Sequence, residues 1–445
     1  IRNDYSLQSQ EYNNIDNNIV VNPNYQVIKK GKFEHETEVD AFLCYENKIT
    51  YKKSGSKIIN EYDSVYGYYD NICVTSLPAI GNEAYSSTSD IFTEKGFIDC
   101  ICADVDDTPG DEILVINNSF DNGFENLNFR VYKTARNTST PQINSLSVTQ
   151  KYNYSLKLPS IATYDADTFA IPKKFLQGDF NGDGLEEILA ISSNNTLGLG
   201  NTSTCYLFDI KNNKKIYEGS PFAFNMVFPQ NADKVDDADR ESDKLYVIDY
   251  DGDSKSDICH INNVGLSIYT FDIQDTTIEC RHISTYDEIT NAIFSTNNDR
   301  KFLIGEFNGD SKTDFLLSAT NNAPTNEKNK WIKYLSKGNG TWDNSFYSII
   351  FDYDSNAQYF LQDMNNDGIS DVIRNHLKDN KTYIGVWLMN TPMQSTSSIA
   401  NLYETECSNG LYFIPSNIYN KHFSNHILGT INSKTKRFYL ENDNY

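Results

Sequence analysis

Five nine-residue segments of the chain carry oxygen-bearing side chains at their first, third, fifth and ninth positions. The residues at these positions are Asp, Asn, Glu and Thr, and the backbone carbonyl of the seventh residue adds a further oxygen. Ca²⁺ is a hard cation that takes about six to eight oxygens, and alternate residues of a tight loop can aim their oxygens at one point. The segments, named here the Asp104, Asp179, Asp249, Glu306 and Asp363 loops, are residues 104–112, 179–187, 249–257, 306–314 and 363–371.

Each loop predicts one structural calcium site, which makes up to five ions in all. In the Asp104 loop, Thr108 at the fifth position is a weaker ligand than Asp, and Pro109 stiffens the turn. The predicted ligands, with the seventh residue contributing its carbonyl, are Asp104, Asp106, Thr108, Gly110 and Glu112; Asp179, Asn181, Asp183, Leu185 and Glu187; Asp249, Asp251, Asp253, Lys255 and Asp257; Glu306, Asn308, Asp310, Lys312 and Asp314; and Asp363, Asn365, Asp367, Ile369 and Asp371.

Two alternative interpretations of the loops are open. An EF-hand or dockerin loop also begins with alternating acids, but it needs a bidentate acid at its twelfth position. The twelfth positions of the four most regular loops are Ala190, His260, Leu317 and Arg374. The other alternative is that the loops are ordinary Asn/Asp/Gly hairpin turns without a metal, which five copies in register disfavour.

The five loops hold almost a third of the 61 acidic residues of the chain. Like charges packed this closely repel, so the hairpins should open when no cation is present. Calcium is therefore expected to bind the folded state and to stabilise it as its concentration rises above the dissociation constant.

The segments around each loop read as strands. Residues 174–176 and 301–304 are largely apolar stretches that precede a loop, and residues 188–191 and 315–317 are β-type runs that follow one. This order of strand, tight loop and strand predicts a β-hairpin at each loop.

The loops belong to a longer repeat. Two weaker copies, residues 32–40 and 430–437, extend the series, so that the copies start near residues 32, 104, 179, 249, 306, 363 and 430. Units of this length suit four-stranded antiparallel blades, which predicts an all-β fold, a seven-bladed β-propeller that occupies residues 1–445 as a single domain. The last copy leaves room for two strands only, so the N-terminal residues should complete its blade. Joining the N- and C-terminal strands in one blade would close the ring and remove exposed sheet edges.

The repeats resemble FG-GAP repeats, also called VCBS repeats, of integrin α-subunit propellers and secreted microbial proteins. The sequence lacks a clear Gly-Ala-Pro element, so it is more similar to the microbial branch. The resemblance implies that each acidic loop links the innermost strand of a blade to its second strand. It also implies an extracellular or cell-surface protein that takes part in adhesion or in recognition of a glycan or protein ligand.

No catalytic motif stands out in the sequence. The six histidines are scattered, and there is no His-Glu-x-x-His, no Gly-x-Ser-x-Gly and no Walker loop. No catalytic residue is predicted, which favours a binding module over an enzyme without deciding between them. The alternatives are a polysaccharide-processing, lyase-like enzyme on the same scaffold, and a propeller subunit of a larger toxin or surface complex.

The composition of the chain limits the kinds of partner that it is expected to bind. The formal net charge of −23 disfavours binding to nucleic acid. No run approaches the eighteen or so apolar residues that a transmembrane helix needs. The eight cysteines form no zinc-type Cys-x-x-Cys pair, but Cys44 with Cys73 and Cys259 with Cys280 could form disulfides within single blades.

Overall fold

A computed structural model of the chain shows an all-β protein. Within the described residues every regular element is a strand and every strand pairing is antiparallel. That part of the chain has no helix with the length and hydropathy of a membrane span. The structure describes residues 5–11, 27–34, 39–48, 52–54, 57–59, 67–76, 85–87, 95–108, 110–121, 124–137, 145–157, 174–194, 202–219, 244–261, 266–272, 277–281, 300–320, 322–326, 328, 330–348, 353–365, 367–378, 381–389, 402–407, 410–416, 426–431 and 434–442.

Four sheets are each built from four strands that follow one another in the chain, so each strand pairs with the next. Short hairpin connections of this kind produce the up-and-down meander that the repeat predicts. The strands are β12 (Lys174–Gly178), β13 (Glu187–Asn194), β14 (Thr202–Asp209) and β15 (Lys214–Gly219); β16 (Lys244–Ile248), β17 (Asp257–Ile261), β18 (Leu266–Asp272) and β19 (Thr277–Arg281); β20 (Phe302–Gly305), β21 (Asp314–Leu317), β22 (Lys330–Ser336) and β23 (Trp342–Ser348); and β24 (Gln358–Gln362), β25 (Asp371–Lys378), β26 (Lys381–Trp387) and β27 (Leu402–Cys407).

A fifth four-stranded sheet combines the two ends of the described chain in the order β1-β30-β29-β28. Strand β1 pairs with β30 over seven residue pairs, from Tyr5↔Asn442 to Glu11↔Lys436. The first strand therefore completes the sheet that the last three strands form. These strands are β1 (Tyr5–Glu11), β28 (Gly410–Ser416), β29 (His426–Ile431) and β30 (Lys434–Asn442).

The remaining large sheet has eight strands in the order β11-β10-β9-β8-β6-β3-β2, with β7 paired to β6. Its two halves are joined where β6 pairs with β8, at Gly67↔Phe97 and Tyr68↔Lys95. A separate two-stranded sheet consists of β4 (Lys52–Ser54) and β5 (Lys57–Ile59). Because one sheet spans what the repeat predicts as two blades, seven blades in a closed ring stay a prediction. The strands are β2 (Val27–Glu34), β3 (Val39–Lys48), β6 (Gly67–Ser76), β7 (Tyr85–Ser87), β8 (Lys95–Ala103), β9 (Glu112–Asp121), β10 (Phe124–Asn137) and β11 (Ser145–Lys157).

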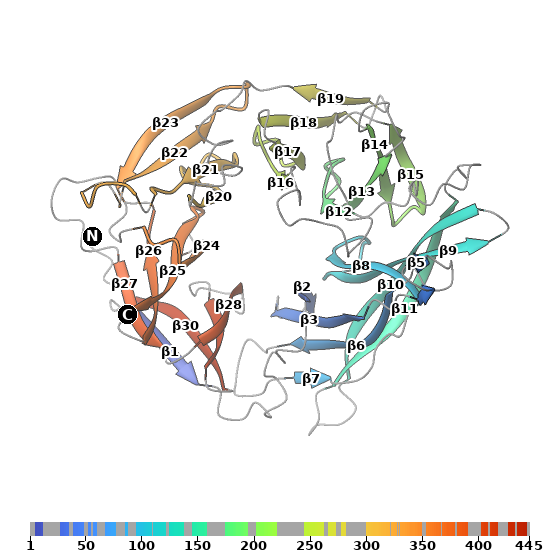
Figure 1. Cartoon of the computed structure of the whole chain (residues 1–445), viewed down its shortest axis with the longest axis horizontal. Helices are drawn as coiled ribbons and strands as arrows, with labels where there is room; N and C mark the ends of the chain where they lie inside the picture. The colour runs from blue at the N-terminus through green and yellow to red at the C-terminus, as the bar shows by residue number, and fades with distance from the viewer. Residues whose placement is uncertain are drawn as a thin grey trace.

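The sheets are arranged around a common centre (Figure 1). Strands β12, β16, β20 and β24 lie toward the centre, and β15, β19, β23 and β27 lie at the periphery (Figure 1). Inner strands of successive sheets contact one another, as β8 contacts β12, β12 contacts β16, and β20 contacts β24. The arrangement is propeller-like, and it brings the starts of all the acidic loops close to the centre.

The core lies between neighbouring sheets. On β13, Ile188 and Ala190 pack toward the sheet of β8–β11, whereas Leu189 and Ile191 pack toward the sheet of β16–β19. Successive side chains of a strand point to opposite faces. A middle strand with both faces covered is therefore mostly apolar, as residues 188–191 and 315–317 are. The buried polar residues His260 on β17 and Arg374 on β25 interrupt this pattern.

Candidate metal centres

All five acidic loops connect the first strand of a unit to the second, as the sequence predicts. The Asp104 loop follows β8 and ends as β9 begins. The same relationship holds for the Asp179 loop between β12 and β13, and for the Asp249, Glu306 and Asp363 loops in the next three sheets. The weaker copies near residues 32 and 430 fall at the β2–β3 and β29–β30 connections, and their side chains lie outside the described residues.

The ninth residue of each loop is a buried acid that holds the start of the loop. Its carboxylate accepts a hydrogen bond from the backbone N–H of the second residue, seven positions earlier in the chain. Exposed fractions of these acids are between 0% and 4%. The bonds run from Val105 N to Glu112 Oε2 (3.2 Å), Phe180 N to Glu187 Oε2 (2.9 Å), Tyr250 N to Asp257 Oδ2 (3.0 Å), Phe307 N to Asp314 Oδ2 (3.0 Å) and Met364 N to Asp371 Oδ2 (2.9 Å).

Burial makes the ionised form of these acids unfavourable. It raises the pKa of Glu112 and Asp314 to about 7 and the pKa of Glu187, Asp257 and Asp371 to about 8. Other acids of the same loop raise each pKa further, and the backbone hydrogen bonds oppose the shift. A cation beside the carboxylate would favour the ionised form and reverse the shift.

In the Asp179, Asp249, Glu306 and Asp363 loops, the first residue folds the chain around its carboxylate. Oδ1 of Asp179 accepts from Gly182 N (2.6 Å) and Asp183 N (3.1 Å), and Oδ2 accepts from Gly184 N (2.9 Å). Asp249 and Asp363 accept equivalent bonds at both oxygens. In the longer Glu306, Oε1 accepts two backbone N–H groups, whereas Oε2 is buried and, among the described residues, has no hydrogen-bond partner.

The third and fifth residues use one side-chain oxygen each to hold the backbone two residues further on. Asn181 Oδ1 accepts from Asp183 N (2.7 Å), and Asp183 Oδ1 accepts from Leu185 N (2.9 Å). The Asp249, Glu306 and Asp363 loops repeat both bonds at distances of 2.9–3.3 Å. Each fifth-position Asp is exposed, and its second oxygen can make a further contact: in the Asp363 loop that oxygen of Asp367 accepts from Asn365 Nδ2 at 2.9 Å. Lys312 Nζ reaches that oxygen of Asp310 at 3.1 Å, and Lys255 Nζ lies 3.9 Å from the one of Asp253.

The Asp249 loop has the most favourable geometry for a cation. Asp249, Asp251 and Asp257 each offer an oxygen, and the three oxygens lie within 4.8 Å of one another. Two oxygens at about 2.4 Å from one calcium ion are separated by at most about 4.8 Å. These three oxygens are compatible with one calcium ion in chemistry and spacing, and the fifth-position residue Asp253 is not part of the triad. Within the described residues this triad is the one cluster of three or more such side chains.

Neighbouring loops are joined by a hydrogen bond that recurs between four pairs of sheets. The backbone N–H of the eighth residue of one loop donates to the carbonyl oxygen of the first residue of the preceding loop. All four bonds measure 2.7 Å and run from Glu186 to Asp104, from Ser256 to Asp179, from Thr313 to Asp249 and from Ser370 to Glu306.

Side chains of the eighth residues strengthen this connection. Glu186 Oε2, Thr313 Oγ1 and Ser370 Oγ accept from the N–H of the same first residue at 3.0–3.2 Å. At Gly178, just before the Asp179 loop, a Cβ would lie 2.5 Å from Ser256 Oγ, so this close approach requires glycine. In the Asp104, Asp179, Asp249 and Glu306 loops, the first predicted ligand is therefore positioned by the loop that follows.

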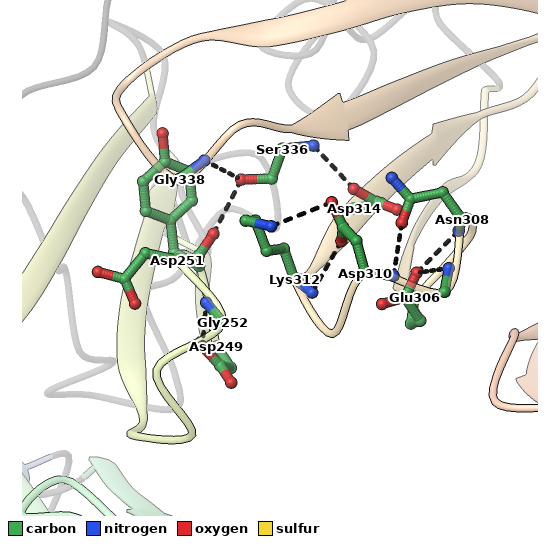
Figure 2. Close-up of polar contacts among 12 residues, drawn as sticks. Asp249, Asp251, Gly252, Glu306, Asn308, Asp310, Lys312, Asp314, Ser336 and Gly338 are labelled. Carbon is green, nitrogen blue, oxygen red and sulfur yellow. Dashed lines mark hydrogen bonds and ion pairs between the residues drawn. The ribbon is translucent and has the colours of Figure 1, made fainter.

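Ser336 makes a second bridge, between the Asp249 and Glu306 loops (Figure 2). It lies at the end of β22, where its N–H donates to Asp314 Oδ1 at 2.7 Å. Its hydroxyl donates to the carbonyl of Tyr250 at 2.8 Å and accepts from Gly338 N at 3.2 Å. The turn after β22 thus sits against the Asp249 loop, and Gly340 N donates to the phenol oxygen of Tyr250 at 2.5 Å.

Sequence reasoning missed Ser336 and Gly338 as members of the site. The signal for the turn is the segment 337–340, Lys-Gly-Asn-Gly, which is typical of a tight hairpin. Nothing in that segment indicates that it packs on Asp251, because the two lie in different sheets.

The positions of the cysteines contradict one of the two disulfides expected from the sequence. Cys259 is a buried free thiol on β17, and Cys280 lies on β19, with β18 between these two strands. The expected Cys259–Cys280 disulfide is therefore wrong, because the strands that carry the two residues are not neighbours. Cys44 and Cys73, in contrast, are directly paired in the register of β3 and β6.

Comparisons with known proteins find distant structural likenesses. No protein-family model matches the sequence, and no curated protein matches it. An Agrocybe aegerita lectin that recognises non-reducing terminal N-acetylglucosamine is similar with a TM-score of 0.48 at 12% identity, over 81% of this chain and 82% of the lectin. A Bacillus licheniformis rhamnogalacturonan lyase has a TM-score of 0.35 at 12% identity, over 92% and 90% of the two chains. The β-propeller domain of Vanderwaltozyma polyspora Nup133 has a TM-score of 0.35 at 11% identity, over 93% and 100%. At these TM-scores none of the three assigns an activity or a ligand to this chain.

Proposed function

We propose that this chain is a calcium-stabilised, seven-bladed β-propeller that acts outside the cell or on its surface as a non-catalytic binding module for a glycan or protein. The observation that carries the proposal is the Asp249 loop, where three carboxylates present oxygens within 4.8 Å of one another and one of them, Asp257, is buried. Three carboxyl groups held this close favour either protonation of one of them or a bound cation, and all-oxygen ligands select a hard cation.

The neighbouring loops extend this chemistry. The Asp179, Glu306 and Asp363 loops share the backbone hydrogen bonds of the Asp249 loop and end in the same kind of buried acid. A cation in each would compensate the acids whose pKa burial has raised. The proposed ions are therefore structural and hold the starts of the inner hairpins in place.

The blade count follows from the repeat together with the strand order. We assign β2, β3, β6 and β7 to one blade and β8–β11 to the next, which divides the eight-stranded sheet at its short β6–β8 contact. With five four-stranded sheets this gives seven blades, and the β1–β30 pairing closes the ring.

The affinity expected of such loops supports a location outside the cell. Most of them offer three acidic side chains and otherwise neutral oxygens, and modules that work in extracellular fluid bind calcium at about 10⁻⁴–10⁻³ M. The calcium sites of such a scaffold would be occupied at the calcium concentration of extracellular fluid. The ligand-binding residues themselves stay unassigned, and the longer repeat units, which start near residues 32, 104 and 179, are the places to seek them.

Thermal unfolding in calcium and in chelator tests the proposal. Each occupied site should add about 2.7 kcal/mol to the free energy of unfolding when calcium is at 100 times its dissociation constant, so the melting temperature should rise with calcium concentration. Magnesium at the same concentration is the control, because it prefers smaller, octahedral sites. A melting temperature that is equal in calcium and in chelator contradicts the proposal.

A binding screen tests the proposed role as a non-catalytic binding module. Arrays of glycans and of extracellular proteins, probed with and without calcium, should yield a ligand that is retained without turnover. Cleavage of an acidic polysaccharide in the same assay would show that the chain is an enzyme and overturn the non-catalytic part of the proposal.

A further inference from the structure

The Asp104 loop differs from the other four in having a lysine at its centre. Lys133, on β10, donates from Nζ to Glu112 Oε1 at 2.6 Å and to the carbonyl of Thr108 at 3.3 Å. It also donates to the carbonyl of Gly110. These oxygens belong to the fifth, seventh and ninth residues, which are three of the five predicted calcium-ligating residues of this loop.

The position of Lys133 follows from the strand register. Tyr132 pairs with Ile113, which places Lys133 beside the ninth loop residue Glu112. The register of the other sheets places a different residue type beside the ninth residue. In order of the loops these residues are Asp209, Thr270, Leu335 and Leu388, and none of them is a cation.

The lysine is held in place rather than free in solvent. Its side chain is 17% exposed and that of Glu112 is fully buried. Glu112 Oε1 also accepts from Thr108 Oγ1 at 3.3 Å, so the ammonium and the hydroxyl share the oxygen that a metal would need. An ammonium ion is a compact cation with three donors, and it satisfies oxygens that converge on one point.

Lysines near the other loops do not play this part. Lys333, on β22, donates to the carbonyl of Phe307 at 3.2 Å, but Phe307 is the second residue of its loop and lies outside the predicted ligand set. Lys333 also interacts electrostatically with Glu306 and Asp314. Lys312 contacts the exposed fifth residue, Asp310. Lys133 differs from both in donating directly to the ninth-position acid and to the seventh-position carbonyl of its loop.

We propose that the Asp104 loop does not bind calcium, because the ammonium of Lys133 occupies its cation position as a built-in counter-ion. The proposal rests on calcium binding by the other loops and reduces the predicted number of ions by one. Thr108 at the fifth position fits this arrangement. Because the lysine already supplies one positive charge, a calcium ion in its place would have to displace the ammonium from a buried carboxylate, which is costly.

Counting bound calcium in matched variants tests the inference. Asp106→Ala and Asp251→Ala remove the third-position ligand of the Asp104 and Asp249 loops in the same way, whereas asparagine would keep an oxygen ligand, as in the three loops that carry Asn at this position. Native mass spectrometry of the folded full chain should show one calcium fewer for D251A and no change for D106A. Loss of one ion in D106A would overturn the inference. A wild-type chain without any bound calcium would instead overturn the proposed function, so the two failures are distinguishable.

Removing the lysine tests the same point in the opposite direction. Lys133→Met combined with Thr108→Asp should create a fifth acidic loop that binds calcium, which adds one ion to the mass spectrum. In chelator, K133M should melt at a lower temperature than the wild type. Calcium should restore more of this lost thermal stability in K133M than in Lys133→Arg, because arginine keeps the positive charge. Equal calcium stoichiometry in K133M/T108D and wild type would contradict the inference. If this double variant does not fold, the comparison of D106A with D251A decides alone.

Discussion

Thr313 and Asp249, which belong to neighbouring sheets, exchange two hydrogen bonds. The N–H of Thr313 donates to the carbonyl of Asp249 at 2.7 Å, and the N–H of Asp249 donates to Thr313 Oγ1 at 3.0 Å. Because Asp249 is the first predicted ligand of its loop, the next loop fixes the position of that ligand. The acidic loops are therefore connected structures rather than independent turns.

Replacement of Thr313 tests this connection. Thr313→Val keeps the shape but removes the hydroxyl, which leaves the partly buried N–H of Asp249 without its side-chain acceptor. The free energy of unfolding should fall by about 1–3 kcal/mol, and calcium binding to the Asp249 loop should weaken. Thr313→Ser keeps the hydroxyl and is the control. Urea unfolding at fixed calcium measures both variants, and equal stability of the valine and serine variants would contradict the prediction.

Gly338 and Gly340 offer a matched pair in the turn that packs on the Asp249 loop. Both have positive φ, 67° and 90°, so alanine strains the backbone at either position by about 1–2 kcal/mol. A Cβ at Gly338 would lie 3.1 Å from Asp251 Cα, whereas a Cβ at Gly340 would have no atom within 4 Å. Gly338→Ala should therefore weaken calcium binding and Gly340→Ala should not. Isothermal titration with calcium makes the comparison, and equal loss in both would show that the turn does not position Asp251.

The buried acids predict how stability depends on pH. Burial raises the pKa of Asp257 and Asp371 to about 8, whereas the pKa of Asp in an unfolded chain is about 3.9. Between these values the folded, calcium-free chain binds protons that the unfolded chain has released, so its free energy of unfolding falls as pH rises. The melting temperature in chelator should be lower at pH 8 than at pH 5. Calcium should flatten this dependence, because the ion favours the ionised form.

Two variants separate the buried acid from the general negative charge of the chain. Asp257→Asn removes the buried charge and should reduce the pH dependence in chelator. Asp253→Asn removes an equal but exposed charge from the same loop and should leave the dependence nearly unchanged. Equal slopes for D257N and wild type would exclude Asp257 as a source of the effect.

Cys44 and Cys73 are paired residues on β3 and β6. Facing residues of antiparallel strands have Cα atoms about 4.5–5.5 Å apart, which lies within the range of about 4.4–6.8 Å for disulfides. In an oxidising compartment the two should form a disulfide. Alkylation of the unfolded chain before reduction should label Cys205 and Cys259, which are free thiols, but should label Cys44 and Cys73 only after reduction. Labelling of both without reduction would contradict the pairing.

The sequence predicted the all-β class and the hairpin at each acidic loop. These features depend on local chemistry, because the apolar runs need burial on both faces and the Asp-Asn-Gly segments form tight turns by hydrogen bonds within a few residues. The repeat placed an acid at every ninth position, but its burial and its hydrogen bond to the N–H seven residues earlier are seen only in the structure. The repeat spacing predicted that N-terminal residues would complete the last sheet with two strands; β1 does pair with β30, but it is one strand beside three C-terminal ones.

Contacts between distant strands and between sheets could not be predicted from the sequence in the same way. That Lys133 enters the Asp104 loop depends on strand register, and that Ser336 and Gly338 reach the Asp249 loop depends on how two sheets pack. The Cys259–Cys280 expectation failed for the same reason, because proximity along the chain did not reveal the strand between them. The sequence determined which segments can surround a cation. Strand register within a sheet and the packing of each sheet against the next decided which side chains complete each loop, because those partners are separated by 21 to 90 residues along the chain.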